Sequence, residues 1–133
     1  MTDIAKALNE LNITEWVLRG EPTTEAEFNS MFRKVTGSDD NGTAIESDDP
    51  ADFGTTWAAV TAKKTELVNA EPMRVLREKR DRLIAETDWW AGSDHTMTDA
   101  QTTYRQALRD ITTQTPTLNS NGELQGITWP TKP

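Results

Sequence analysis

Few residues in this chain of 133 residues could support catalysis. His95 is the only histidine, and it follows Ser93 and Asp94, which together supply the side-chain types of a serine hydrolase. A catalytic triad is defined by its geometry in space, which adjacency in sequence does not supply, and the Gly-x-Ser-x-Gly turn is absent. We therefore predict that His95 is an exposed loop residue and that the chain has no catalytic residue.

Carboxylates could instead bind a metal ion or act as an acid–base pair. Around Gly42, Asp39 and Asp48 partly match a calcium-binding loop, but Gly37 would then occupy the first ligand position. One histidine and no cysteine exclude a His- or Cys-based metal cluster within one chain. Neighbouring acids such as Asp48 and Asp49 stay hydrated in a polar loop, whereas a glycosidase needs one acid with a raised pKa. The sequence thus predicts no metal ion, no cofactor and no enzyme activity.

The five tryptophans are stronger indicators of a binding surface. Tryptophan can stack on sugar rings or anchor a protein interface, and its alternative is core packing. We expect Trp16 and Trp57 to lie in the core. Trp89 and Trp90 are adjacent, so at a helix end they would point about 100° apart and cannot both face one core. One of these two is therefore a candidate interface residue.

Charge and composition restrict the partner. The net charge is −8, and the basic residues between 63 and 82 alternate with acids, which is typical of a solvated helix face. Nucleic acid is bound through clustered Lys and Arg, and a bilayer is crossed by about 18 apolar residues or more. We predict neither a nucleic-acid nor a membrane partner. The absence of cysteine suits a reducing cytosol or a particle assembled there.

The first part of the chain is predicted to contain two helices and a short strand. Apolar spacing predicts a helix over residues 3–11, and the β-branched and aromatic residues within 13–22 favour a short strand slightly over a helix extension. Thr24 and Glu27 form a capping-box pattern that opens a helix ending near Gly37. The apolar stripe of that helix consists of Phe28, Met31, Phe32 and Val35.

A long polar segment separates this region from two further predicted helices. Residues 36–53 are acidic and are expected to form a mobile loop, a solvated hairpin or a contact loop, with a tight turn at Gly42. Helices are predicted over about 55–70 and about 72–87, with Pro72 in the first turn of the second.

The C-terminal part is predicted to contain a helical hairpin. Thr98 and Gln101 form a second capping box, which opens a helix reaching Ile111. The short loop 88–97 then predicts an antiparallel pair with the preceding helix. The fold class is therefore mainly α: a small helical domain with this hairpin, one or two short strands and an extended Trp-Pro tail. Residues 1–70 and 71–133 are expected to form one compact unit.

The hairpin and tail contain three joined motifs, RDRLIAETDWW, YRQALRDI and ITWPTKP. Together they resemble the tail assembly chaperone family of tailed bacteriophages, and Tyr-Arg with a later Trp-Pro more loosely resembles tail-fibre assembly proteins. The sequence departs from the family pattern at Ile84, which replaces a leucine, and at residues 112–113, where a proline often stands. The matching positions are Arg80, Arg82, Leu83, Ile84, Thr87, Asp88, Trp89, Tyr104, Arg105, Ala107, Leu108, Arg109, Asp110, Ile111, Trp129, Pro130 and Pro133.

The hairpin offers a physical reason for such a motif. Arg105 and Arg109 lie four residues apart on one helix face, and Asp88 could bond either guanidinium across the hairpin. We expect Trp89 to pack with Tyr104 between the helices. The tail would then fold back over the same surface. The predicted partner-binding residues are Asp88, Trp89, Trp90, Tyr104, Arg105, Arg109, Trp129 and Pro130.

The resemblance implies a non-enzymatic role in assembling a phage tail or tail fibre, with a tail or tail-fibre protein as partner. It places the protein in the host cytoplasm during assembly, or in the virion. The first 70 residues are similar to small proteins of T4-like marine phages, which imply no function. Two alternatives stay open: a minor structural component retained in the virion, and an acidic inhibitor of a host protein.

Overall fold

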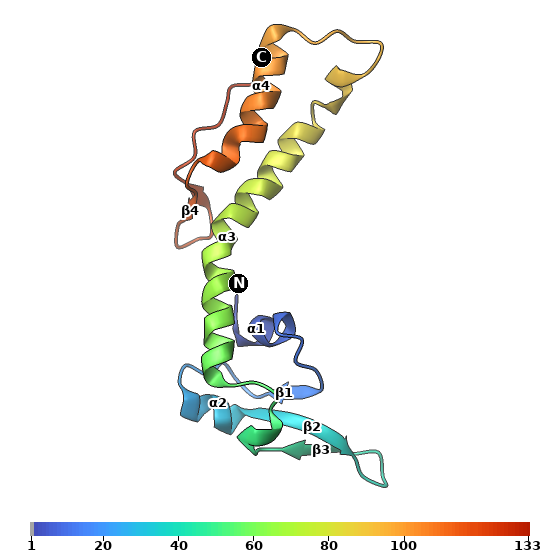
Figure 1. Cartoon of the computed structure of the whole chain (residues 1–133), viewed down its shortest axis with the longest axis vertical. Coiled ribbons are helices and arrows are strands. Elements are labelled where there is room, and N and C mark those ends of the chain that lie inside the picture. The colour runs from blue at the N-terminus through green and yellow to red at the C-terminus, as the bar shows by residue number, and fades with distance from the viewer. Residues whose placement is uncertain (1) are drawn as a thin grey trace. The chain divides into compact units, whose positions relative to one another are not determined.

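A computed structural model describes residues 2–133, and the chain divides into two compact units, Met1–Asn69 and Ala70–Pro133. The described residues form four α-helices and five β-strands (Figure 1). The strands make one three-stranded and one two-stranded antiparallel sheet. The prediction of a mainly α fold with one or two short strands was therefore wrong in its strand content, and the fold is mixed.

The first unit begins as predicted. Helix α1 (Ile4–Glu10) is capped by Asp3, whose side chain accepts the Lys6 N–H, and strand β1 (Trp16–Leu18) follows. Helix α2 (Glu25–Met31) starts at Thr24, whose hydroxyl accepts the Glu27 N–H, so the predicted helix start is confirmed. An N-cap of this kind satisfies a backbone donor that the helix itself cannot pair.

The end of α2 differs from the prediction of a helix continuing to Gly37. The helix stops at Met31, and Phe32 opens strand β2 (Phe32–Ser38) with extended backbone angles. Strand β2 lies at the centre of the sheet, with β1 on one side and β3 (Ala44–Ser47) on the other. Its backbone therefore gains two strand partners, which outweigh a helical apolar spacing that fits both structures.

Of the structures expected for residues 36–53, the solvated hairpin is the one that forms, since β2 pairs with β3 antiparallel. This segment contains the end of β2, all of β3 and the short 3₁₀ helix η1 (Pro50–Asp52). The tight turn predicted at Gly42 is confirmed by its φ of 78°, which favours glycine. The register shifts between Val35 and Gly37, which marks a β-bulge.

Three phenylalanines pack together within the core of the first unit. The ring centroids of Phe28 and Phe32 lie 5.0 Å apart, and those of Phe32 and Phe53 lie 4.6 Å apart. Trp16 and Trp57 pack against this cluster half-buried, as predicted. The buried members are Ile4, Ala7, Leu8, Phe28, Phe32, Phe53 and Val60.

The two helices predicted over 55–70 and 72–87 form one helix, α3 (Trp57–Ala85), and the boundary between the compact units falls inside it. Pro72 therefore lies in a helix interior and not in a first turn. Proline has no backbone N–H, so the Val68 carbonyl loses the hydrogen bond that it would otherwise accept from residue 72. Val68 is 48% exposed, so this turn of the helix is open to water.

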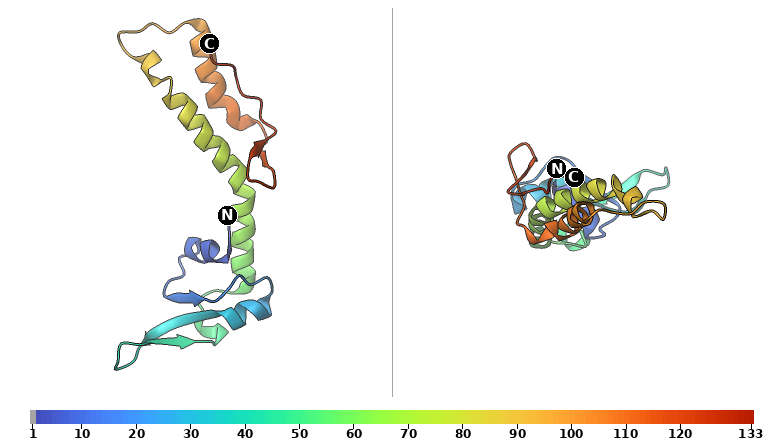
Figure 2. Two further views of the ribbon diagram at one scale, coloured as in Figure 1. Left: turned by 180° about the vertical axis from the view of Figure 1, so that it is seen from behind. Right: turned by 90° about the horizontal axis from the view of Figure 1, so that it is seen from above.

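In the second unit, helix α4 (Asp99–Arg109) runs back beside the end of α3 (Figures 1 and 2). Its capping box at Thr98 and Gln101 is confirmed with both reciprocal hydrogen bonds. The 3₁₀ helix η3 (Asp110–Thr113) continues it, and the predicted extended tail contains a small hairpin of β4 (Thr117–Leu118) and β5 (Leu124–Gln125). Among residues 2–133, no helix combines the length and the apolar composition that a bilayer span requires.

Candidate partner-binding site

A run of tight turns joins α3 to α4, and we name residues 86–98 the aromatic turn. The Thr87 N–H donates to the Ile84 carbonyl, and the Trp90 N–H donates to the Thr87 carbonyl. The 3₁₀ helix η2 (Asp88–Ala91) carries both adjacent tryptophans. This backbone is therefore internally bonded, and its side chains are presented from a defined conformation.

Arg105 of α4 forms hydrogen bonds with the aromatic turn and with the end of α3. Its Nη1 donates to the Thr87 hydroxyl at 2.7 Å and to the Ile84 carbonyl at 3.3 Å. Its Nη2 lies 3.2 Å from an Asp88 carboxylate oxygen, so the predicted ion pair across the hairpin is present, and Arg105 is the arginine that makes it. Arg109 is exposed, and within residues 2–133 it forms no ion pair.

The burial of this contact is uneven. Arg105 is 7% exposed and Thr87 is fully buried, whereas the Asp88 side chain is 64% exposed. Within residues 2–133, no group accepts a hydrogen bond from the buried Nε of Arg105. Because buried hydrogen bonds to a charged group stabilise more than surface ion pairs, the Thr87 contact carries more weight than the Asp88 contact.

The two tryptophans of η2 are separated as predicted, but their roles differ from the prediction. Trp90 is 4% exposed and packs on Tyr104, with ring centroids 6.0 Å apart. Trp89, which we expected in that position, is 64% exposed. Its ring lies 6.2 Å from Trp90 and 5.3 Å from His95. Trp90 is thus a core residue, and Trp89 is a surface aromatic residue whose ring contacts Trp90 and His95.

The C-terminal tail returns to the same cluster, as the sequence predicted for Trp129. Trp129 packs half-buried against the core of Trp90, Tyr104 and Leu108. The Lys79 Nζ lies 4.6 Å from the Trp129 ring centroid, and the Lys132 Nζ lies 5.9 Å from that of Trp90. Pro130 follows half-buried. Cation–π contacts of this kind stabilise by about 0.5–1 kcal/mol at exposed sites.

The aromatic turn is acidic at its surface. Residues 86–99 contain four carboxylates, and the stretch from 83 to 104 contains no lysine or arginine. The carboxylates are Glu86, Asp88, Asp94 and Asp99. Burial raises the pKa of the Tyr104 phenol, and the charge of Glu86 adds to that rise. The turn therefore combines an exposed indole with a negative surface.

The structure does not bring together the residues of the catalytic or metal sites that were considered from the sequence. His95 is half-buried, not exposed as predicted, and its Nε2 lies 3.2 Å from the Gln101 amide oxygen, without a hydroxyl nucleophile as partner. Asp39 accepts the N–H groups of Asn41 and Thr43, which is a turn and not a calcium loop. Within residues 2–133 no group of three or more His, Cys, Asp or Glu is placed to hold a metal ion.

Sequence reasoning missed two contributors to the turn. Thr87 was recognised only as a motif position, although it is the buried acceptor of Arg105. Lys79 was read only as part of a solvated helix face, whereas it stacks over Trp129. An arginine at a buried position needs acceptors, so a small hydroxyl residue within the motif was the available signal.

Residues 73–133, nearly the whole second unit, match the family model described as phage tail assembly chaperone protein. The comparisons with curated proteins and with solved structures gave no match. The matched segment contains the aromatic turn, α4 and the Trp-Pro tail. Over residues 73–133, somewhat less than half of its length, the chain is similar to the phage tail assembly chaperone family.

Proposed function

We propose that this protein acts without catalysis in phage tail assembly and binds a tail or tail-fibre subunit through the exposed face of the aromatic turn. The family match supports the role in tail assembly. The binding surface rests on one observation: Trp89 is 64% exposed on a turn that the buried Arg105 holds in place. Assembly of a tail in this way takes place in the host cytoplasm.

The Trp89 side chain is preorganised for binding. A tryptophan that is already fixed in its bound conformation loses little side-chain entropy on binding, and interface energy concentrates at such aromatic residues. Trp90 and His95 support the Trp89 ring from two sides. Trp89 therefore serves as the anchor, while Trp90, Tyr104 and Trp129 act indirectly by holding the turn.

The surface charge adds specificity. Four carboxylates lie within residues 86–99, the stretch that also carries the exposed Trp89. The complementary surface on the tail subunit is therefore an apolar recess bordered by Lys or Arg. Charge pairs at the rim of an interface mainly raise the association rate, and salt weakens them. Association should accordingly slow as ionic strength rises, while the contribution of Trp89 persists.

The test is co-purification of the tagged full chain from infected cells. The variant Trp89→Ala should reduce recovery of the tail subunit at least tenfold, because an anchor residue contributes about 2 kcal/mol or more. Its free energy of unfolding should stay within about 0.5 kcal/mol, as for other surface changes. The matched control is Ile45→Ala, an exposed apolar residue of the first unit, which should leave recovery unchanged.

Equal recovery of the tail subunit by Trp89→Ala would contradict the proposed surface. Recovery of host proteins alone would favour the alternative of a host inhibitor. Mass spectrometry of purified virions then separates a transient assembly factor, which should be missing from the particle, from a retained tail component.

A further inference from the structure

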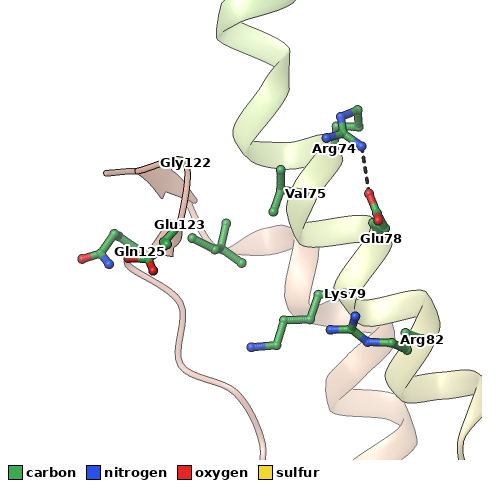
Figure 3. A pocket seen from close by; sticks show the side chains of 9 residues that line it. Arg74, Val75, Glu78, Lys79, Arg82, Gly122, Glu123 and Gln125 are labelled. Atoms are coloured by element: carbon green, nitrogen blue, oxygen red, sulfur yellow. Dashed lines mark hydrogen bonds and ion pairs between the residues drawn. The ribbon is translucent and has the colours of Figure 1, made fainter. Parts of the chain in front are cut away.

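A second surface of this unit has the opposite charge character. A cleft of about 660 Å³ lies between one face of α3 and the β4–β5 hairpin (Figure 3). Its volume is within the range of about 300–1,000 Å³ that is typical of ligand sites. The helix contributes Arg74, Val75, Glu78, Lys79 and Arg82, and the hairpin contributes Gly122, Glu123, Leu124 and Gln125.

The cleft has an excess of positive charge that the protein itself does not neutralise. Arg74 is held by Glu71 and Glu78, whose hydrogen bonds and charges raise the pKa of its guanidinium. By contrast, within residues 2–133 neither Lys79 nor Arg82 has a carboxylate partner. Figure 3 shows both side chains extending from the helix on the side of the cleft. The lining holds three basic residues against the two acids Glu78 and Glu123, so the cleft keeps a net positive charge in a chain of net charge −8, and this favours an anionic ligand.

The hairpin side favours an extended peptide as the form of that ligand. Only the β5 strand of the hairpin lines the cleft, and one of its edges pairs with β4. Among residues 2–133 no strand pairs with its other edge. A peptide in extended conformation can add to such an edge through its main chain. Val75 and Leu124, both half-buried, supply apolar contact for its side chains.

From the unpaired cations, the open strand edge and the apolar pair, we infer that this cleft binds an acidic, extended peptide segment of a partner protein. Lys79 and Arg82 pair with carboxylates of the segment, while Val75 and Leu124 contact its apolar residues. A nucleic acid would need a longer track of cations than these two. The inference goes beyond the surface proposed for the tail subunit, since the aromatic turn is acidic and would repel the same segment.

The probe is the capped hexapeptide Glu-Leu-Asp-Glu-Leu-Asp, titrated into the isotope-labelled full chain at low salt. Backbone amide shifts should change at residues 74–82 and 122–125. The double variant Lys79→Gln, Arg82→Gln should bind about tenfold more weakly, which corresponds to about 1.4 kcal/mol. The double variant Arg77→Gln, Arg80→Gln changes the net charge equally on the same helix outside the cleft, and it should bind as the unchanged chain does.

Three outcomes would overturn the inference. Equal weakening by both double variants would mean non-specific attraction. Equal binding of the neutral peptide Gln-Leu-Asn-Gln-Leu-Asn would remove the role of charge. Tighter binding of a single-stranded oligonucleotide at the same amides would assign the cleft to nucleic acid. Because Trp89→Ala should leave peptide binding unchanged, a failure of the cleft is distinguishable from a failure of the aromatic turn.

Discussion

Arg105 brings a full positive charge into a position that is 7% exposed, and its carboxylate partner Asp88 lies at the surface. The guanidinium satisfies the Thr87 hydroxyl and the Ile84 carbonyl at the end of α3, so it replaces the partners that a helix end lacks. An arginine fits this role because its planar fork reaches several acceptors at once. The residue therefore determines where the aromatic turn leaves the helix.

Replacing Arg105 should destabilise the second unit. We expect Arg105→Ala to lower the free energy of unfolding by about 2–3 kcal/mol, because the buried Thr87 hydroxyl and the part-buried Ile84 carbonyl lose a charged donor. Asp88→Ala should cost less than about 1 kcal/mol, because that carboxylate is 64% exposed. Urea unfolding followed by circular dichroism measures both. Arg109→Ala, exposed on the same helix, is the control, and a cost equal to that of Arg105→Ala would contradict the assignment.

Tyr104 makes the free energy of unfolding depend on pH in the alkaline range. Burial, aided by Glu86, raises the pKa of its phenol in the folded state above the ordinary value of about 10. Above pH 10 the unfolded chain releases this proton while the folded chain retains it. The contribution of Tyr104 is therefore complete below pH 10 and is lost as pH rises through the folded pKa.

This is directly measurable because Tyr104 is the only tyrosine. The phenolate absorbance of the native chain should titrate at higher pH than that of the urea-unfolded chain. Tyr104→Phe should abolish the signal in both. A native titration at or below that of the unfolded chain would show that the phenol is not buried in solution.

At the scale of elements, α3 contains a weak turn at Pro72. Proline inside a helix costs up to about 3 kcal/mol relative to alanine. We expect Pro72→Ala to raise the free energy of unfolding by about 1–3 kcal/mol, measured by urea unfolding. Val68→Ala, exposed in the same helix, should change it by less than about 1 kcal/mol, which separates the backbone effect from helix propensity. No gain in Pro72→Ala would mean that the helix already bends without strain.

Strand β2 shows where local pattern stops determining structure. Phe28, Met31, Phe32 and Val35 fit a helical stripe, yet Phe32 pairs in register with Leu18 of β1. The same residue is buried in either structure, so burial alone could not separate them. Pairing with β1 and with β3 decides in favour of the strand, and such pairing depends on residues distant in sequence.

For the molecule as a whole, buried side chains form two separate clusters. We therefore expect substitutions in one cluster and in the other to have additive effects on the free energy of unfolding. No residue belongs to both clusters. Phe32→Ala and Leu108→Ala should each cost about 3–5 kcal/mol, within the range for buried large residues. Their effects in the double variant should add within about 0.5 kcal/mol. Urea unfolding of the single variants and the double variant tests this, and a larger interaction energy would show that the clusters are coupled.

The sequence predicted the elements that local chemistry determines. Caps at Thr24 and Thr98, strand β1 and the turn at Gly42 follow from short-range spacing. The predicted hairpin brought Asp88 near two arginines of α4, but only the structure selects Arg105 over Arg109. The sequence did not predict which of Trp89 and Trp90 is buried, because their adjacency shows only that the two side chains point in different directions. Which of the two meets Tyr104 depends on the exit of the turn from α3, which Arg105 and Thr87 determine in three dimensions.

The difference in exposure between Trp89 and Trp90 also allows partner binding to be followed by intrinsic tryptophan fluorescence. An indole in water emits at longer wavelength than one in a core, and a soluble quencher reaches it more readily. Trp89 is 64% exposed while Trp90 is 4% exposed, so docking of a partner over the aromatic turn would shift and protect the emission of the former. Because residues 86–99 carry four carboxylates and no lysine or arginine, a caesium ion should quench Trp89 more strongly than an iodide ion. Occupancy of the turn can thus be followed by fluorescence without attaching a label.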